Sequence, residues 1–333
     1  MVKWPFNLAE LNSKGVSFLL PHYLSASIQG CTILTNSQSQ YHLGVMRLPI
    51  ADVNGIKLFF ETNGTGYPII FCHEFAGDYR SWDSQVEYFS RLYKTVTYSA
   101  RGYYPSEIPK DVGDYSQDQS VGDLKSLMHY LNIDKAHIVG LSMGGNVALN
   151  FGLTNPEMTS SLVIAGTGTG SDAPDIFRQK VLEMSDGMKS KGMNYMRNYA
   201  FGPARVQLRN KSPKAFDLFR SQFMEHSSIG SANSFEGVLS KRPPIFDLVD
   251  KLHRIETPTL IMTGDEDDPC INPSLFLKKH ISSSGLVVFP RSGHAINLEE
   301  PGLFNSVVSD FLLMVEQGKW APRDLGQGSG SLT

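Results

Sequence analysis

The chain has 333 residues, of which 41% are hydrophobic and 19% are charged, and its formal net charge is -3. This composition is that of an ordinary globular protein and excludes disordered and fibrous classes, while the length favours two domains or one large domain with an insertion. The small negative charge gives no field that would attract polyanions, so nucleic acid is not expected as a partner.

Membrane and secretion signals are weak along the chain. No run approaches the roughly 18 to 20 apolar residues that a membrane span needs, so we expect no membrane anchoring. Residues 16–24 faintly resemble a signal peptide, but Pro21 and His22 interrupt the apolar run. The three cysteines, Cys31, Cys72 and Cys270, are too few for a disulfide framework. We therefore expect a cytoplasmic protein.

The predicted elements begin after an extension. Residues 1–46 are rich in Ser, Asn and Gln without sustained periodicity, which predicts a poorly ordered N-terminal extension. Residues 48–60, with the turn Asn54-Gly55, predict an antiparallel hairpin. Strands and helices then alternate, with strands over 68–73, 95–99, 136–140 and 161–165 and helices over 81–93, 117–131 and 144–151. This rhythm predicts an α/β fold with a mostly parallel sheet and helices on both faces.

The alternation stops between residues 171 and 252, where methionines, aromatic residues and scattered charges predict a helical cap inserted into the fold. A strand over 257–263, a helix over 273–281, a strand over 286–289 and a helix over 303–315 complete the predicted sheet. We therefore expect a core built from residues 47–170 and 253–322, followed by a frayed Gly- and Ser-rich tail over 323–333.

The predicted strand 136–140 leads into Gly140-Leu141-Ser142-Met143-Gly144-Gly145. The pattern Gly, any residue, Ser, any residue, Gly is a nucleophile elbow, in which a strand turns at once into a helix. The turn holds the serine in a strained backbone conformation, so its neighbours two positions away must lack bulk. A plain glycine-rich turn is the alternative, but the place in the middle of the sheet favours Ser142 as a nucleophile.

A serine hydroxyl needs a base to take its proton, and the base needs an acid to fix its tautomer. After the predicted strand 257–263 the chain reads Gly264-Asp265-Glu266-Asp267-Asp268, and after the last predicted strand it reads Ser292-Gly293-His294. Because the carboxyl ends of parallel strands share one edge of a sheet, we expect Ser142, an acid of this turn and His294 to meet there. A calcium loop is excluded for the turn because its spacing is wrong.

From about residue 46 to residue 322 the chain resembles the α/β-hydrolase superfamily in these motifs, in their order and in the inserted cap. The resemblance implies Ser142 as nucleophile, His294 as general base and Asp267 as the orienting acid, since the superfamily acid is usually the third residue after the strand-end glycine. It implies no metal and no organic cofactor.

The resemblance also implies two backbone N–H groups that stabilise an oxyanion, those of Met143 and Phe75. Phe75 is assigned from the loop Phe71-Cys72-His73-Glu74-Phe75, in which Glu74 stands where the superfamily usually has glycine. A carboxylate beside an oxyanion would oppose catalysis. We therefore expect Glu74 to face outward or to pair with an arginine.

Two further residues are singled out. Arg101, followed by Gly102, resembles a superfamily loop that supports the floor of the site, so we expect a structural role. His226 is a candidate for lining the substrate pocket, although a histidine in a cap more often lies at the surface or is satisfied in a core. The inner face of the cap is expected to roof the pocket, with a minority of its Phe and Met side chains facing Ser142.

The expected reaction is attack on the carbonyl of a carboxylic ester or lactone, giving an acyl-serine that water releases with the help of His294. The expected partner is a small ester-like molecule. Two alternatives stay open: a carbon–carbon bond hydrolase of the ring-cleavage type with the same triad, and a non-catalytic small-molecule receptor on the same fold. Epoxide hydrolases and haloalkane dehalogenases are disfavoured because they place aspartate where this chain has Ser142.

Overall fold

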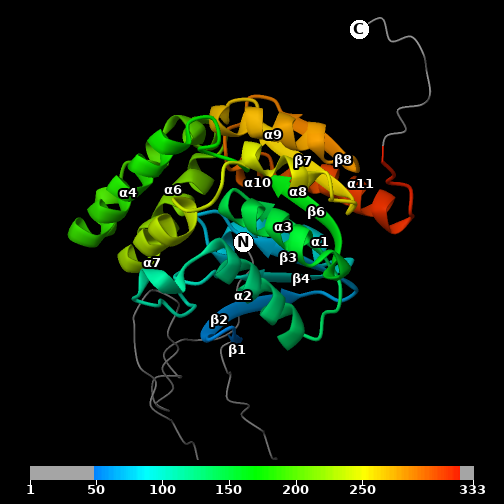
Figure 1. Cartoon of the computed structure of the whole chain (residues 1–333), viewed down its shortest axis with the longest axis horizontal. Coiled ribbons are helices and arrows are strands. Elements are labelled where there is room, and N and C mark those ends of the chain that lie inside the picture. The colour runs from blue at the N-terminus through cyan, green and yellow to red at the C-terminus, as the bar shows by residue number, and fades with distance from the viewer. Residues whose placement is uncertain (1–48, 323–333) are drawn as a thin grey trace, which may run out of the picture. The chain divides into compact units, whose positions relative to one another are not determined.

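The computed structural model describes residues 49–322, so the predicted extension 1–46 and the predicted tail 323–333 lie outside the described residues. Eight strands form one sheet in the order β1-β2-β4-β3-β5-β6-β7-β8 (Figure 1). β1 pairs with β2 and β2 with β4 antiparallel, and the remaining pairs are parallel. The strands are β1 Ile50–Val53, β2 Ile56–Asn63, β3 Tyr67–Cys72, β4 Tyr93–Tyr98, β5 Ala136–Leu141, β6 Thr159–Ala165, β7 Thr259–Gly264 and β8 Ser284–Phe289.

The first two strands form the predicted hairpin. Asn54 and Gly55 connect them with φ values of 48° and 77°. Such positive values at both central residues suit the tight turn that matches the twist of an antiparallel pair. The helix predicted over 81–93 is shorter, because Tyr93 already pairs with Tyr67 of β3, and it consists of the short 3₁₀ helix η2 Tyr79–Trp82 followed by α1 Asp83–Phe89.

Helices cover both faces of the sheet, which confirms the predicted fold class. Alternate residues of β3 show the two faces: Ile70 belongs to the buried cluster that includes residues of α2, α3 and α9, whereas Ile69 and Phe71 belong to the cluster that includes residues of α1 and α11. The core helices are α2 Gln117–Tyr130, α3 Met143–Thr154, α9 Asp268–His280, α10 Ile296–Glu299 and α11 Pro301–Glu316. α9 begins five residues earlier than predicted, so that Pro273 lies inside it.

Only helices are assigned between β6 and β7 in this described part of the chain, and we refer to residues 171–252 as the helical insertion. Its elements are α4 Pro174–Lys191, the 3₁₀ helices η5 Met193–Met196, η6 Tyr199–Phe201 and η7 Pro203–Arg205, α5 Val206–Lys211, α6 Pro213–Met224, α7 Ser228–Asn233, the π-helix η8 Ser234–Leu239, the 3₁₀ helix η9 Ile245–Leu248 and α8 Val249–Leu252. In Figure 1, α4, α6 and α7 are grouped together at one side. The insertion therefore leaves the sheet at the carboxyl end of β6, the edge from which ligand sites of parallel sheets are built.

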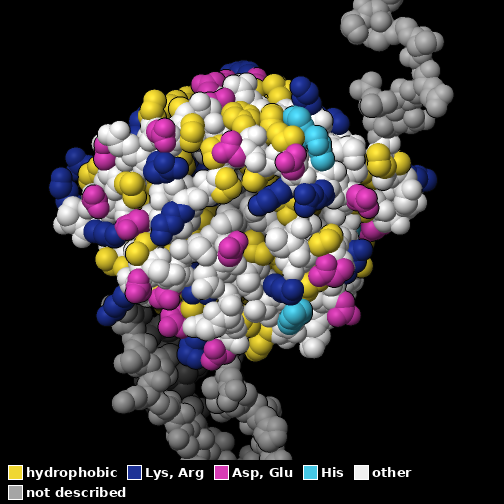
Figure 2. Space-filling model, viewed as in Figure 1, with side chains coloured by type: hydrophobic (Ala, Val, Ile, Leu, Met, Phe, Trp, Pro, Cys, Tyr) yellow, Lys and Arg dark blue, Asp and Glu magenta, His cyan; other side chains and the backbone are white. Residues whose placement is uncertain are grey.

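Charges on the surface are mixed in sign. Figure 2 shows basic and acidic side chains interspersed on the face drawn. Lys57 and Asp52, a pair with exposed side chains, exemplify ion pairs that contribute little to stability. No helix within residues 49–322 combines the length and the apolar character that crossing a bilayer requires.

Candidate active site

Ser142 lies at the turn between β5 and α3, with φ 56° and ψ −109°. A non-glycine residue in this region costs on the order of 1–3 kcal/mol, so the surroundings must impose it. The Ser142 N–H donates to the Ala165 carbonyl at 2.8 Å, and its own carbonyl accepts from Asn146 N at 3.0 Å. A Cβ at Gly144 would overlap the carbonyl oxygen of Cys72. The glycine after the serine is therefore required by close approach of β3 to the start of α3.

Asp267 and His294 follow the carboxyl ends of β7 and β8. Nδ1 of His294 donates to Oδ2 of Asp267 at 2.7 Å, and both side chains are buried. The backbone N–H of His294 donates to the carbonyl of Ala204 at 2.9 Å, which ties the histidine loop to the helical insertion. Asp265 instead accepts from Ser292 N at 3.0 Å. Of the acids in this turn, Asp267 is the one that holds the imidazole.

The two groups change each other's protonation. Burial lowers the pKa of His294, but the charge of Asp267 and its hydrogen bond raise it by more, so it lies above the ordinary value. Burial raises the pKa of Asp267, and His294 together with weaker partners brings it below the ordinary value. Because Nδ1 keeps its proton toward Asp267, the Nε2 atom is the one left to accept a proton.

Ser142 and His294 line the same cavity, whose volume is about 450 Å³. Among the hydrogen bonds of residues 49–322, none joins Ser142 Oγ to His294. Such bonds in ligand-free enzymes are commonly long and tighten when substrate binds. The common cavity therefore brings serine and imidazole to one reaction space, with Asp267 behind the imidazole.

The two residues expected to supply oxyanion donors lie beside Ser142. Phe75 lines the cavity, and its ring stacks on Phe235 of η8 at 3.9 Å between centroids. Met143 is the first residue of α3, where a backbone N–H has no acceptor within the helix. Within the described part of the chain, neither the Phe75 N–H nor the Met143 N–H donates to another group. Within the described residues, both N–H groups are thus free to donate a hydrogen bond to an oxygen atom of a ligand.

Glu74 pairs with Arg205 of η7, the second of the two arrangements expected for it. Two guanidinium nitrogens contact its two carboxylate oxygens, one at 3.0 Å, and both side chains are buried. Burial raises the pKa of Glu74, but Arg205 brings it below its ordinary value. Glu74 Oε2 also lies 3.9 Å from Nε2 of His294. Nothing in the sequence distinguishes Arg205 from other arginines as this partner, 131 residues away.

The segment around Arg205 makes further contacts with the loops of the site. Gln207 of α5 donates to the Glu266 carboxylate at 2.8 Å, beside the acid. Lys211 of α5 donates to Ser292 Oγ at 2.9 Å, beside the base. Together with the Ala204 carbonyl and Arg205, these contacts connect residues 204–211 to three separate loops of the core. We call residues 204–211 the clamp.

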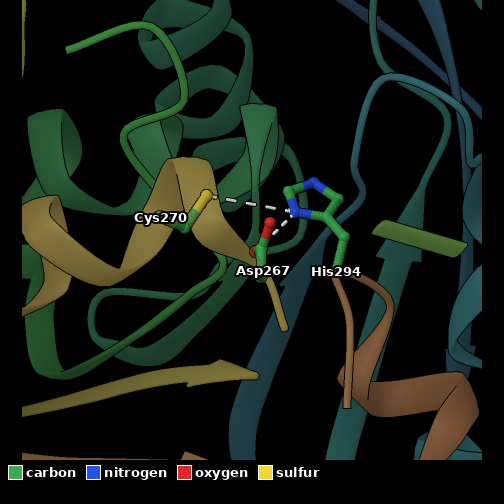
Figure 3. A group of neighbouring side chains, drawn as sticks. All are labelled: Asp267, Cys270 and His294. Atoms are coloured by element: carbon green, nitrogen blue, oxygen red, sulfur yellow. Dashed lines mark hydrogen bonds and ion pairs between the residues drawn. The ribbon is translucent and has the colours of Figure 1, made fainter. Parts of the chain in front are cut away.

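Cys270 completes a buried group with the acid and the base (Figure 3). Its Sγ lies 4.0 Å from Nδ1 of His294 and 3.1 Å from Oγ1 of Thr169. A carboxylate, a thiol and an imidazole within 4.8 Å could hold a metal ion by distance. Burial raises the pKa of the Cys270 thiol well above its ordinary value, and Nδ1 is already hydrogen-bonded to Asp267. These states suit an acid and base pair better than a metal centre.

His226, the candidate for lining the substrate pocket, has the alternative placement, packed away from Ser142. It lines a separate cavity of about 100 Å³ together with Asp78 and Arg80, and not the cavity of Ser142. Its ring packs edge-on against Tyr103 and Phe223, and Nε2 lies 3.7 Å from Asp78 Oδ2. These contacts hold the ring between the core and α6. The structure therefore does not bring His226 to the site.

Arg101 has the structural surroundings expected of it. Its guanidinium donates to both carboxylate oxygens of Asp123, at 3.0 and 2.7 Å, and to the Asn54 carbonyl at 3.1 Å. Both side chains of the ion pair are buried. Arg101 thus joins α2 to the hairpin turn.

The apolar residues of the helical insertion divide as expected. Of the Phe and Met side chains of the insertion, Phe177, Met184 and Phe235 line the cavity of Ser142. A larger group is buried in one cluster within the insertion: Met188, Met193, Met196, Phe216, Phe219 and Phe223. A minority of the insertion's large apolar side chains therefore roofs the cavity, and the majority holds the insertion together.

Comparisons with known proteins place the chain among relatives of one fold. A family model described as alpha/beta hydrolase fold matches residues 67–301, more than half of the chain. The 3-oxoadipate enol-lactonase 2 of Acinetobacter baylyi is 26% identical over 242 residues, which cover 72% of this chain and 86% of that protein. The 2-hydroxy-6-oxononadienedioate/2-hydroxy-6-oxononatrienedioate hydrolase 1 of Pseudomonas putida is 29% identical over 235 residues, 66% of this chain and 77% of that protein.

A solved structure shows the same fold. The thermophilic esterase of Thermogutta terrifontis superposes with a TM-score of 0.71, at 24% identity, over 78% of this chain and 94% of the esterase. At that identity the likeness extends to the architecture of the chain and no further.

Proposed function

The chain belongs to the alpha/beta hydrolase fold family and is a hydrolase, and from that premise we propose that it cleaves a carboxylic ester or lactone through an acyl-serine intermediate. The observation that carries the proposal is the strained Ser142, which opens on one cavity with His294, whose Nδ1 is held by Asp267 at 2.7 Å. A similar enol-lactonase supports the reaction class.

In the proposed first step, Ser142 Oγ attacks the carbonyl carbon while His294 Nε2 takes the hydroxyl proton. Asp267 keeps its negative charge and stabilises the imidazolium that forms. The negative charge that develops on the carbonyl oxygen is stabilised by the N–H groups of Met143 and Phe75, each of which is worth about a hundredfold to a thousandfold in rate. The imidazolium then protonates the leaving alkoxide, or the alkoxide end of an opened lactone.

In the second step, water attacks the acyl carbon of the ester formed on Ser142, and His294 takes a proton from that water. The tetrahedral intermediate collapses with Ser142 Oγ as leaving group, which takes the proton back from His294. The carboxylic acid product is released and the enzyme returns to its starting state. The step requires only water, the acyl-serine and the same acid and base pair.

A fluorophosphonate probe tests the nucleophile. The folded protein should be labelled at Ser142, and the Ser142→Ala variant should stay unlabelled. Ser190→Ala, which removes a hydroxyl on α4 remote from β5, should be labelled like the unaltered protein. Labelling at another serine would show that Ser142 is not the nucleophile. No labelling of the folded protein would contradict the acyl-serine proposal and favour a receptor on the same fold.

Kinetics test whether serine and histidine act together. Ser142→Ala and His294→Ala should each lower kcat by about a millionfold, and the double variant should lose little more, because each group is useless without the other. Losses that add would contradict the assignment. The measurement is steady-state hydrolysis of an activated phenyl ester.

Carbon–carbon bond hydrolysis is the second candidate. It is favoured by the match to the Pseudomonas putida hydrolase, at 29% identity over 66% of this chain. Incubation with a vinylogous 1,5-diketone and with esters of similar size separates the two candidates. Turnover of the diketone with a kcat/KM at least tenfold above that of the best ester would assign carbon–carbon cleavage.

A further inference from the structure

Arg242 lies in the wall of the cavity that contains Ser142 and His294. It follows the π-helix η8, and its side chain is partly buried. Nη2 donates to the carbonyl of Thr169 at 2.7 Å, and the guanidinium carbon lies 5.4 Å from the centre of the Phe177 ring. Within residues 49–322, no carboxylate oxygen lies within 4.0 Å of a guanidinium nitrogen of Arg242. Among the residues that the structure describes, the cavity therefore presents a cation without an acidic partner.

Other buried arginines of the chain are neutralised. Arg101 is paired with Asp123, and Arg205 is paired with Glu74, each through two hydrogen bonds. Arg242 has a carbonyl group and an aromatic face instead. A guanidinium has five N–H donors and stays charged. One nitrogen of Arg242 donates to the Thr169 carbonyl. Donors thus remain for a planar anion that binds through two oxygens.

Burial lowers the pKa of Arg242 to about 10. The side chain is still cationic at neutral pH. A buried charge without a partner is unfavourable, and an anionic ligand would remove that cost. The protein therefore holds Arg242 in an arrangement that a ligand carboxylate would complete.

The remaining wall of the cavity suits a ligand with an apolar body. Val181 and Met184 of α4 line it, together with other aliphatic and aromatic side chains. Two further charged residues line it, Lys180 and Asp172, and both are exposed. Asp172 already accepts from Asn272 at 3.0 Å. The partly buried charge on this wall is thus positive.

We propose that Arg242 binds a carboxylate of the substrate, so that the preferred substrates are esters or lactones that carry a free carboxylate in addition to the bond that is cleaved. This inference rests on the proposed ester or lactone hydrolysis and names the substrate class for it. In this arrangement Ser142 attacks the ester carbonyl while the guanidinium fixes the far end of the same molecule. The intervening apolar part contacts α4.

The test compares substrates that differ only in charge. One series consists of 4-nitrophenyl monoesters of dicarboxylic acids from succinate to suberate, each matched with the corresponding terminal carboxamide. A second series places the carboxylate or the carboxamide on the phenyl leaving group. In at least one matched pair, kcat/KM should be about 10- to 100-fold higher for the carboxylate, the range expected for a charged hydrogen-bonded pair. Equal rates in all pairs of both series would overturn the proposal.

Variants assign the preference to Arg242. Arg242→Gln keeps a donor near the Thr169 carbonyl and removes the charge, and it should lower kcat/KM far more for the carboxylates than for the carboxamides, so that the ratio between matched substrates falls to about one. Arg242→Lys should retain part of the preference. Arg178→Gln is the matched control, because Arg178 lies nearby on α4 but does not line the cavity of Ser142, and its preference should be unchanged. An equal loss on both substrates in folded Arg242→Gln would contradict a carboxylate site.

Binding separates this inference from the proposed function. Calorimetry with Ser142→Ala, which cannot turn over an ester, should show tighter binding of the carboxylate monoester than of its carboxamide, and Arg242→Gln in that background should remove the difference. If the protein hydrolyses both kinds of ester but neither binding nor kinetics depends on Arg242, the carboxylate site is wrong and the hydrolase proposal stands. If the carboxylate binds through Arg242 but no ester is cleaved and Ser142 is not labelled, the hydrolase proposal is wrong.

Discussion

The buried pair of Glu74 and Arg205 offers a test of how the helical insertion supports the catalytic groups. Their side chains are only 2% and 3% exposed. At the 3.0 Å separation of Arg205 Nη1 and Glu74 Oε1, an effective dielectric constant of about 20 gives an attraction of roughly 5 kcal/mol, which offsets the loss of hydration of both ions. Removing one partner keeps the hydration cost of the other without the attraction, and typically costs about 3–5 kcal/mol.

We therefore expect Glu74→Gln and Arg205→Met each to lower the free energy of unfolding by about 3–5 kcal/mol. The double variant leaves no unpaired charge and should lose less than the sum of the two by several kcal/mol. Urea unfolding of the four proteins measures this coupling. Lys57→Gln is the control, because Lys57 and Asp52 are 63% and 76% exposed and the change should cost less than about 1 kcal/mol.

The same variants should move the pH profile of hydrolysis in opposite directions. The charge of Arg205 lowers the pKa of His294, and the charge of Glu74 raises it. Glu74→Gln leaves the arginine and should lower this pKa, whereas Arg205→Met leaves the carboxylate 3.9 Å from Nε2 and should raise it. Because only the neutral imidazole acts as base, the acid limb of kcat/KM should move to lower pH in the first variant and to higher pH in the second.

The double variant should return the acid limb toward its original position. If the pair of Glu74 and Arg205 had a structural role alone, the two single variants would lose stability but their acid limbs would stay at the same pH. The reasoning is refuted if both acid limbs move the same way, or if the stability losses simply add.

The remaining predictions concern the acid and the elbow. Asp267→Asn should lower kcat about ten-thousandfold. It should also shift the acid limb of kcat/KM to lower pH, because Asp267 raises the pKa of His294. Asp265→Asn should lower kcat less than about tenfold, and a larger loss in Asp265→Asn than in Asp267→Asn would show that the acid is misassigned. Gly144→Ala should destabilise the fold by about 3 kcal/mol or more in thermal or urea unfolding, since its Cβ overlaps a backbone carbonyl, whereas Gly302→Ala meets open space in the first turn of α11 and should be neutral or mildly stabilising.

Much of the core could be predicted because its information is local. Buried parallel strands read as short apolar runs, and the helices between them show a period near 3.6. Because the three residues each follow a parallel strand, the sequence also predicts that Ser142, Asp267 and His294 lie at one edge of the sheet. The structure places all three at strand ends, with Asp267 hydrogen-bonded to His294.

Contacts between the insertion and the core could not be predicted in this way. The partner of Glu74 depends on how η7 docks, and the 131 residues between Glu74 and Arg205 carry no periodic signal that fixes it. The position of His226 likewise depends on how the insertion docks. Its ring packs against Tyr103 and does not line the cavity of Ser142. No motif in the sequence marks Arg242, because its significance lies in the absence of a nearby carboxylate among the described residues, which depends on the tertiary fold.

The helical insertion therefore combines two tasks that are carried by different residues. Met184 and Arg242 form part of the cavity wall. Among the hydrogen bonds of residues 49–322, none joins either of them to Ser142, Asp267 or His294. The clamp, residues 204–211, instead binds the backbone of His294 and the carboxylate of Glu74. Changes in the wall should alter which substrates fit, and changes in the clamp should alter the rate for every substrate, because the clamp positions the base itself. A simple division into a catalytic core and a specificity-determining insertion does not describe this arrangement, since part of the insertion supports His294, the proposed base.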